Sequence, residues 1–513
     1  MKRFLLYIIV LLLASCSVFN EKSEMALTED KVLTDSVALE RNLVLAIYTK
    51  LGGSRSGEGL QGTDRGIYDL NTFTTNEAII PTRGGDWYDS GIWQQLFTHT
   101  WDAGHEAVEN AWNYLYEQIA NTNRSIDLLE KYKNTISTPT YNRHLAELKC
   151  LRALFYYYLL DLFGNVPIVR SSTVDFADIA QSSRADVFQF VVSELETNVQ
   201  YLALQRSNHP GNYYGRITQP VVWFLLAKLW LNAPIYTGTT DYLKVIDNTS
   251  KLTDFGYTLE KDYSACFSVH NEFSTENIFT IPMNSSLYSN LFTIQFRSLH
   301  YQHAAALGYS GENGPCATLE TNEVFGYKTK SLDNRYALNF FYDTVYVESS
   351  QLLLSNGKPL VYYPLEVDLD LTGSDYMITA GARMNKYAYD PTALSDGKLR
   401  ENDIVLFRYA DALLMQAEAK VRMGLSGQDE LDEITNRAGM PSCQATLENI
   451  YRERWRELMW EGWHRQDMIR FNLYQQPYAC HQETDFEADQ HTNIFPIPAP
   501  VITSTKLTQN KGY

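Results

Sequence analysis

One segment, residues 142–163, constrains the fold most, because it predicts a long helix whose apolar face must be covered by a neighbour. Its sequence is NRHLAELKCLRALFYYYLLDLF, and Gly164 and Pro167 follow as stop signals. Ala146 and Ala153 leave room for a second helix to approach closely. One stripe at helical spacing is apolar: Leu145, Leu148, Phe155, Leu159 and Leu162.

The same helical periodicity recurs along the chain, often in pairs of segments with short connections. Such pairing predicts a mainly α fold, in which tetratricopeptide-like helix pairs pack into a superhelix, although no clean repeat of about 34 residues can be counted. The other predicted helices span residues 32–51, 106–132, 185–204, 219–232, 404–423 and 447–471.

The pattern of residue types changes between residues 260 and 400. β-branched and aromatic residues surround Asn356 and Gly357, a dipeptide that favours a tight hairpin turn. We expect an insert of loops and short strands here, between an N-terminal helical part (residues 31–259) and a C-terminal helical part (residues 401–513) that completes the same domain. Loops on a rigid scaffold are where binding sites usually lie.

The N-terminus has the anatomy of a secretory signal peptide. Lys2 and Arg3 precede the apolar run 4–13, which is too short to span a bilayer as a helix. The tetrapeptide Leu-Ala-Ser-Cys ending at Cys16 resembles the bacterial lipobox, which predicts removal of residues 1–15 and lipidation of Cys16. An ordinary secretory ending is the alternative. Residues 16–30 are polar and predict a flexible tether.

Charge and cysteine usage exclude several classes of partner. The net charge of −18 argues against nucleic acid and against anionic membrane surfaces. Five widely spaced cysteines besides Cys16 form no CxxC or Cys/His pair, so neither a structural zinc site nor a disulfide framework is indicated. His99 and His105 lie six residues apart without a cysteine or clustered acid. We therefore predict no metal site and no cofactor.

The aromatic loop at residues 71–101 has the chemistry of a sugar-binding site. Its sequence, NTFTTNEAIIPTRGGDWYDSGIWQQLFTHTW, offers Arg83, Asp86, Trp87 and Trp101, in a chain whose aromatic content is 13%. An indole stacks on the C–H face of a pyranose, and charged planar groups form paired hydrogen bonds with vicinal hydroxyls. The alternative is that the rings are buried anchors that hold the loop in place.

A second concentration of functional-looking residues is ERWRELMWEGWHRQDMIRF, residues 453–471. Glu453, Glu457 and Glu461 are four apart, which places carboxylates at glycosidase-like spacing but on one side of one helix. A glycosidase needs two carboxylates that flank the scissile bond. Local pairing (Glu453 with Arg456, Arg454 with Glu457, Glu461 with Arg465) therefore predicts a structural helix with Trp455, Leu458, Met459 and Trp463 on its apolar stripe.

These residues also carry a resemblance to a known family. The stretch at 453–471 and the C-terminal NIFPIPAPVITSTKLTQNKGY are similar to the closing signature of the SusD/RagB family, surface lipoproteins of Bacteroidetes outer membranes. Further matching segments occur in the family's order, among them ANTNRSIDLL, ITQPVVWFLLAKLWLNA and IVLFRYADALLMQAEAKVRMG. The resemblance implies a non-catalytic, lipid-anchored protein exposed at the cell surface. It also implies that the protein captures an oligosaccharide and delivers it to a SusC-like TonB-dependent outer-membrane transporter.

The resemblance further implies where the ligand binds. The binding face is expected to use residues 71–101, with Arg83, Asp86, Trp87 and Trp101, and residues 283–309, with Tyr288 and Tyr301. Asn76 stands where the family often has aspartate. Two alternatives stay open: capture of peptides by the same transporter-lid mechanism, and a surface glycosidase that would depend on Glu457.

Overall fold

The computed structural model describes residues 33, 35–175, 179–284, 290–393, 397–398, 400–482 and 487–513. The predicted signal peptide, the tether, the lipidation site Cys16 and the predicted ligand contact Tyr288 lie outside these residues. Among the described helices, none combines the length and the apolar character needed to cross a membrane.

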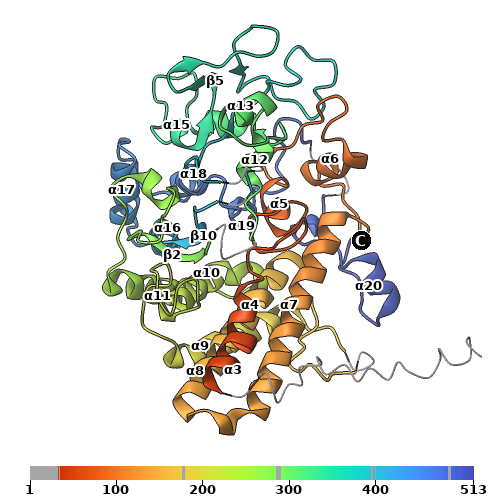
Figure 1. Ribbon diagram of the computed structural model, residues 1–513, viewed down its shortest axis with the longest axis vertical. Coiled ribbons are helices and arrows are strands. Elements are labelled where there is room, and N and C mark those ends of the chain that lie inside the picture. The colour runs from red at the N-terminus through yellow and green to blue at the C-terminus, as the bar shows by residue number, and fades with distance from the viewer. Residues whose placement is uncertain are drawn as a thin grey trace, which may run out of the picture.

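Long helices that pack against their neighbours in sequence form the lower part of the molecule (Figure 1). Helix α8 begins with the Ser137 cap and Pro139 in its first turn, and ends at Gly164 with φ 70°. α8 packs against both α7 and α9, α10 packs against α11, and α11 packs in turn against α16. The long helices of this part are α7 (Glu106–Lys131), α8 (Thr138–Phe163), α9 (Arg184–Asn198), α10 (Gln219–Thr237) and α11 (Tyr242–Phe255), and α16 (Tyr409–Arg422) lies above them at mid-height in Figure 1.

The first predicted helix, 32–51, is present with an irregular centre. α3 (Ser36–Leu39) continues through a π-helical segment, Glu40–Leu45, into α4 (Ala46–Tyr48). Asp35 caps its start by accepting hydrogen bonds from the backbone of Val37 and Ala38. The mainly α architecture of paired helices expected from the sequence is confirmed.

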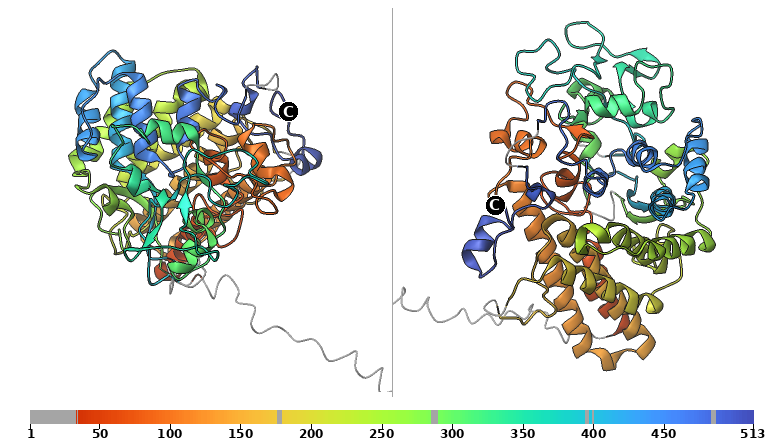
Figure 2. Two further views of the ribbon diagram at one scale, coloured as in Figure 1. Left: turned by 90° about the horizontal axis from the view of Figure 1, so that it is seen from above. Right: turned by 180° about the vertical axis from the view of Figure 1, so that it is seen from behind.

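The insert forms the opposite end of the molecule, at the top of Figure 1 and, seen from behind, of Figure 2. The Asn356–Gly357 turn is present, since Leu353 and Pro359 pair across it and Gly357 has φ 76°. The two-residue strands pair antiparallel as β1 (Ala78–Ile79) with β3 (Cys316–Ala317), β4 (Phe340–Phe341) with β9 (Arg383–Met384), β5 (Asp343–Thr344) with β8 (Val361–Tyr362), and β6 (Tyr346–Val347) with β7 (Ser350–Gln351).

The sequence did not predict the short helices that accompany these strands. Within the insert they are α12 (Ile294–Ser298), α13 (Tyr301–Ala306), α14 (Leu319–Val324) and α15 (Tyr336–Asn339). Outside it, α5 (Ile67–Thr72) overlaps the start of the aromatic loop, α6 (Ile92–Phe97) lies within that loop, and α20 (Ala499–Ser504) lies near the C-terminus.

The predicted helix 404–423 is wrong in its first turn. Residues Ile404–Arg408 form strand β10, which pairs antiparallel with β2 (Asn277–Ile281), and the helix begins only at Tyr409. All five residues of β10 are buried, as are all five of β2. A short, fully buried apolar run is compatible with strand or helix, and the pairing with β2, more than a hundred residues away, decides for the strand.

The predicted single helix 447–471 is also wrong, because two helices, α18 (Leu447–Leu458) and α19 (His464–Arg470), are separated by a buried turn. Trp460 (φ 67°) and Gly462 (φ 72°) adopt left-handed backbone conformations in that turn. The Trp460 backbone N–H donates to a carboxyl oxygen of the buried Glu77 at 2.7 Å, and the Trp460 carbonyl accepts a bond from the Tyr68 hydroxyl at 3.2 Å. These distant partners satisfy backbone groups that a continuous helix would have used itself. A separate helix, α17 (Gln428–Arg437), packs against α16 and α18.

Candidate functional site

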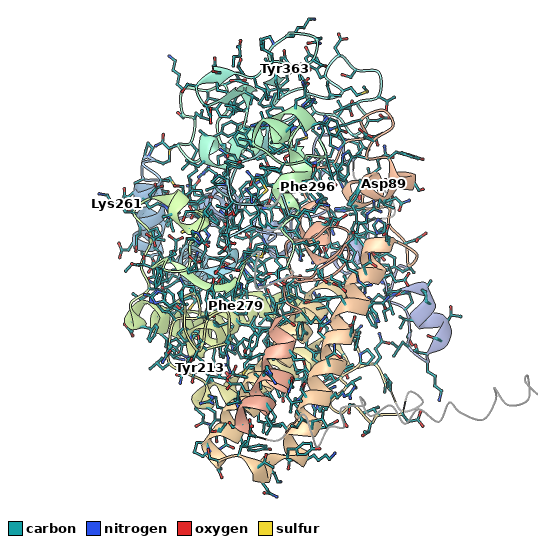
Figure 3. The ribbon with its side chains drawn as sticks, viewed as in Figure 1. Asp89, Tyr213, Lys261, Phe279, Phe296 and Tyr363 are labelled. Carbon is teal, nitrogen blue, oxygen red and sulfur yellow. The ribbon has the colours of Figure 1, made fainter. Side chains whose placement is uncertain are left out.

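A polar hollow of about 380 Å³ lies between the aromatic loop and the insert. We call it the acidic hollow. Its walls come from the chain before α5, from the turn between β1 and α6, and from the region of α13; Asp89 is labelled beside α6 in Figure 3. The lining residues are Asp64, Arg65, Asp86, Trp87, Asp89, Tyr301 and Glu312. Three of the residues proposed from the sequence, Asp86, Trp87 and Tyr301, are therefore brought together.

Trp87 is held as a half-buried platform in this hollow. Its backbone is left-handed (φ 61°), and its indole N–H donates to the Glu312 carbonyl at 2.7 Å. A Cβ at Gly314 would come within 2.5 Å of the indole, so Gly314 permits the ring to lie directly on the backbone of the insert. The Trp93 ring lies 5.7 Å away, centre to centre. The ring is fixed from two sides and remains partly exposed, which is the arrangement that stacking on a ligand requires.

Asp86 and Tyr301 join the two segments across the hollow. The Tyr301 hydroxyl donates to the Asp86 carboxylate, and both side chains are exposed to solvent. Partial burial and the neighbouring carboxylate raise the pKa of Tyr301 to about 12. Tyr301 therefore keeps its proton at neutral pH and leaves acceptor positions on Asp86 for a ligand hydroxyl.

The lining is acidic because its one cation is already paired. Arg65 contacts Asp89 at 2.9 Å and Glu106, outside the hollow, at 2.8 Å, and its guanidinium lies 5.5 Å from the Trp93 ring centre. The Trp93 indole N–H donates to the same Asp89 at 2.8 Å. The four acids Asp64, Asp86, Asp89 and Glu312 thus outnumber the single base.

Arg83, proposed as a ligand contact, lies in the interior behind the hollow. It is only 3% exposed, and its guanidinium donates to the backbone carbonyls of Met377 (2.8 Å), Ala380 (3.1 Å) and Gly314 (3.3 Å). Burial, with Arg383 nearby, lowers the pKa of Arg83 to about 9. The side chain holds the aromatic loop against the insert and is not among the residues that line the hollow.

Trp101, also proposed as a ligand contact, is a core residue. It is 1% exposed, its indole N–H donates to the Tyr513 hydroxyl at 2.8 Å, and its ring packs on Phe495 at 4.8 Å. Here the structure favours the alternative of a buried anchor. Asn76 likewise points away from the hollow, since its side-chain oxygen contacts His464 at 2.8 Å.

The glutamates of residues 453–471 belong to a buried ionic network. Glu457 contacts Arg335 at 2.6 Å, Arg408 at 2.5 Å and also Arg437. Burial alone would raise the pKa of Glu457, but the three arginines hold it well below its usual range. Glu461 contacts Lys386 at 2.6 Å and Arg408 at 2.8 Å. Both carboxylates are therefore buried and paired with basic side chains in the interior.

The predicted pairing within this segment is correct for one pair of three. Glu453 contacts Arg456 at 2.6 Å as expected. Arg454 contacts Asp411 at 2.7 Å and Asp467 at 2.9 Å in place of Glu457. Arg465 contacts Asp161 at 3.0 Å in place of Glu461. The broken helix turns these charges toward other elements, which the assumption of one continuous helix missed.

Four lining residues were not predicted: Asp64, Arg65, Asp89 and Glu312. Asp64 and Arg65 stand in the glycine-rich segment GGSRSGEGLQGTDRG, where no periodicity marks a face. Asp89 lies within the predicted loop, two residues from Trp87, so proximity to the indole was an available signal. Glu312 belongs to a segment held by distant backbone contacts, since the N–H groups of Glu312 and Gly314 donate to the carbonyls of Phe296 and Arg297.

A second hollow, of about 430 Å³, lies between the first helix and α7. No aromatic side chain is among its lining residues, which are Leu33, Asn42, Leu43, Ala46, Ile47, Lys50, Asn121, Arg124, Ser125 and Leu128. Without a ring for stacking it is the weaker candidate for sugar recognition.

Comparison with known proteins gives consistent matches along the chain. A family model described as the SusD family matches residues 275–513, and one described as starch-binding associating with outer membrane matches residues 68–231. The starch-binding protein SusD of Bacteroides thetaiotaomicron is 24% identical over 493 residues, covering 89% of this chain and 87% of the relative. SusD-like protein P2 of Formosa agariphila is 23% identical over 472 residues, covering 84% and 85%.

Solved structures share the fold. Surface glycan-binding protein A from Bacteroides thetaiotaomicron, in complex with laminarihexaose, superposes with a TM-score of 0.72 at 18% identity, covering 94% of this chain and 100% of that chain. A SusD-like protein from Bacteroides fragilis gives a TM-score of 0.74 at 17% identity, with 95% and 99% covered.

Proposed function

Because the chain belongs to the SusD family, we propose that it is a non-catalytic glycan-binding protein of the cell surface. It captures an oligosaccharide in the acidic hollow and delivers it to a SusC-like TonB-dependent transporter in the outer membrane. Lipidation at Cys16 anchors it to that membrane. Relatives named for binding starch and laminarihexaose support the ligand class.

The observation that carries the proposal is the Trp87 platform with hydrogen-bonding groups at its edge. The indole is half-buried and fixed by its bond to the Glu312 carbonyl, and Asp86 and Tyr301 line the same hollow. Ligand sites of this size combine a hydrophobic surface with a few oriented polar groups. A pyranose placed on the ring would bury its C–H face and direct hydroxyls to the carboxylate and the phenol.

The buried network supports binding without catalysis. The three glutamates at glycosidase-like spacing, Glu453, Glu457 and Glu461, are at most 2% exposed and are paired with basic residues. A general acid and a nucleophile must both reach the scissile bond. These side chains therefore serve the fold.

Affinity electrophoresis in gels that contain single polysaccharides tests the proposal. We expect one or more polysaccharides to retard the protein, no reducing ends to be released, and Trp87→Ala to abolish the retardation. Tyr88→Ala is the matched control, because Tyr88 is an exposed aromatic on the same turn that does not line the hollow. Competition by oligopeptides but not by oligosaccharides would instead support peptide capture. Equal retardation of Trp87→Ala and wild type would refute the assigned site.

A further inference from the structure

Three buried side chains with metal-ligand chemistry meet behind the aromatic loop. His99 follows α6, whereas His481 and Glu487 come from the chain after α19. The three residues are at most 1% exposed, and their ligand atoms all lie within 4.8 Å of one another. No local sequence pattern marks this cluster, because His99 lies more than 380 residues before both of its partners.

The hydrogen bonds of the two histidines define which ring nitrogens carry hydrogen. His99 Nε2 lies 2.7 Å from the Thr74 carbonyl oxygen, and His481 Nδ1 lies 2.8 Å from the Phe97 carbonyl oxygen. A carbonyl only accepts, so both of these nitrogens donate. The remaining nitrogens, His99 Nδ1 and His481 Nε2, present their lone pairs when the rings are neutral.

Both remaining nitrogens point to the same carboxylate oxygen. Glu487 Oε1 lies 2.6 Å from His99 Nδ1 and 3.4 Å from His481 Nε2. His481 Nε2 is buried and makes no hydrogen bond of acceptable geometry. Three electron-pair donors in the interior require a cation among them. A proton on His99 would satisfy the shorter contact but would leave the buried His481 Nε2 without a donor.

We propose that His99, His481 and Glu487 bind one divalent transition-metal ion, with zinc as the best match. Two imidazoles and a carboxylate are a ligand set that zinc uses, and metal-bound histidines commonly donate their other N–H to a backbone carbonyl, as both do here. Zinc ligands at about 2.0–2.2 Å lie about 3.3 Å apart in a tetrahedron. The His481–Glu487 separation of 3.4 Å fits this value, and the His99–Glu487 separation of 2.6 Å needs a shift of less than about 1 Å. The three ligand atoms lie within 4.8 Å of one another, so the remaining pair needs to close by at most about 1.5 Å.

The ion would fasten the end of the aromatic loop to the C-terminal segment. His99 has φ 54° and its ring stacks on Tyr474 at 4.4 Å, while Trp101 follows two residues later in the core. The proposed role is structural, because the site is buried and distinct from the acidic hollow. The metal-site proposal is independent of the proposed function, since no step of it depends on glycan binding.

Metal analysis of the whole chain, extracted in detergent and purified without an added histidine tag, tests the proposal. We expect near-stoichiometric zinc by plasma mass spectrometry. After removal of zinc by a chelator, a cobalt(II) titration should saturate at one equivalent with visible absorption typical of tetrahedral coordination. Zinc should raise the melting temperature of the chelated protein.

His481→Ala is the informative variant. The control is His270→Ala, which also removes one histidine, but at an exposed position. We expect His481→Ala to lose the bound metal and the zinc-dependent rise in melting temperature, and His270→Ala to keep both. Should His481→Ala fail to fold, the wild-type cobalt spectrum and stoichiometry decide. A wild-type protein that binds no zinc or cobalt after titration, or a folded His481→Ala that binds as wild type, would overturn the proposal in favour of a proton held between His99 and Glu487.

Discussion

Tyr301 donates a hydrogen bond to the carboxylate of Asp86, 215 residues earlier in the chain. This contact closes the acidic hollow between the aromatic loop and the insert, and it brings one residue from each of the two segments expected to form the binding face into a single group.

Removing the Tyr301 hydroxyl should weaken glycan binding without removing the ring. Tyr301→Phe leaves Asp86 without its fixed donor, and we expect affinity to fall by about fivefold, equivalent to about 1 kcal/mol. Isothermal titration calorimetry measures the change. Tyr88→Phe should leave affinity unaltered, and an equal effect in both variants would argue against a role for this hydrogen bond.

Filling the space at Gly314 should displace the Trp87 platform. A Cβ there would lie 2.5 Å from the indole, so Gly314→Ala forces the ring to move. We expect retardation in affinity gels to be strongly reduced. Gly85→Ala, on the same loop with no atom within 4 Å of its added Cβ, should bind as wild type. Undiminished binding by Gly314→Ala would show that the ring position is unimportant.

The acidic lining should disfavour anionic glycans. Four carboxyl groups face one arginine that is already paired, so a uronate or sulfate group would meet electrostatic repulsion. On a glycan array we expect neutral oligosaccharides to bind more tightly than acidic ones of equal length. The double variant Asp64→Asn/Asp86→Asn should reduce the difference in affinity between neutral and acidic oligosaccharides. Added salt should reduce the same difference. A wild-type preference for acidic glycans would contradict the prediction.

Glu457→Gln should destabilise the fold severely. Its loss leaves Arg335, Arg408 and Arg437 in the interior without their shared carboxylate, and breaking a buried pair costs about 3–5 kcal/mol. Thermal unfolding monitored by circular dichroism measures the loss. Glu448→Gln on the same helix removes only the exposed contact with Arg452, so it should cost less than about 0.5 kcal/mol.

Glu77 should make stability fall as pH rises. Burial raises the pKa of Glu77 from 4.5 to about 8, so the folded protein retains a proton that the unfolded chain releases. This contribution is fully present below pH 4.5 and is lost as pH rises to about 8. Glu77→Gln imitates the protonated form. The stability of this variant relative to wild type should therefore increase as pH rises from 4.5 to about 8. A pH-independent difference in melting temperature between the two proteins would contradict this.

The sequence predicted the helical framework well because local periodicity and caps are sufficient there. Helices α7 and α8 were placed within a few residues, since helical periodicity and the Gly164 stop act locally; the Ser137 cap starts α8 four residues before the predicted start. Periodicity failed at Ile404–Arg408 and at Met459–Trp463, where partners distant in sequence, β2 and Glu77, override the local preference.

The candidate site was predictable in part. The indole, acid and phenol of Trp87, Asp86 and Tyr301 belong to residue types that sugar recognition uses, and they do line one hollow. Arg83 and Trp101 have the same chemistry, yet they are buried. Residue type states what a side chain can bind but contains no information on whether solvent reaches it.

By itself, the sequence determined the mainly α class, the family and the segments that carry binding chemistry, because these depend on local patterns and on matching motifs. Only the tertiary structure decided which aromatic and charged side chains are exposed. It also decided that Glu457 binds three arginines and that His99 meets His481 and Glu487. Each of these outcomes depends on contacts between residues far apart in the chain. Burial controls the chemistry of these side chains, and it exists only once those contacts form.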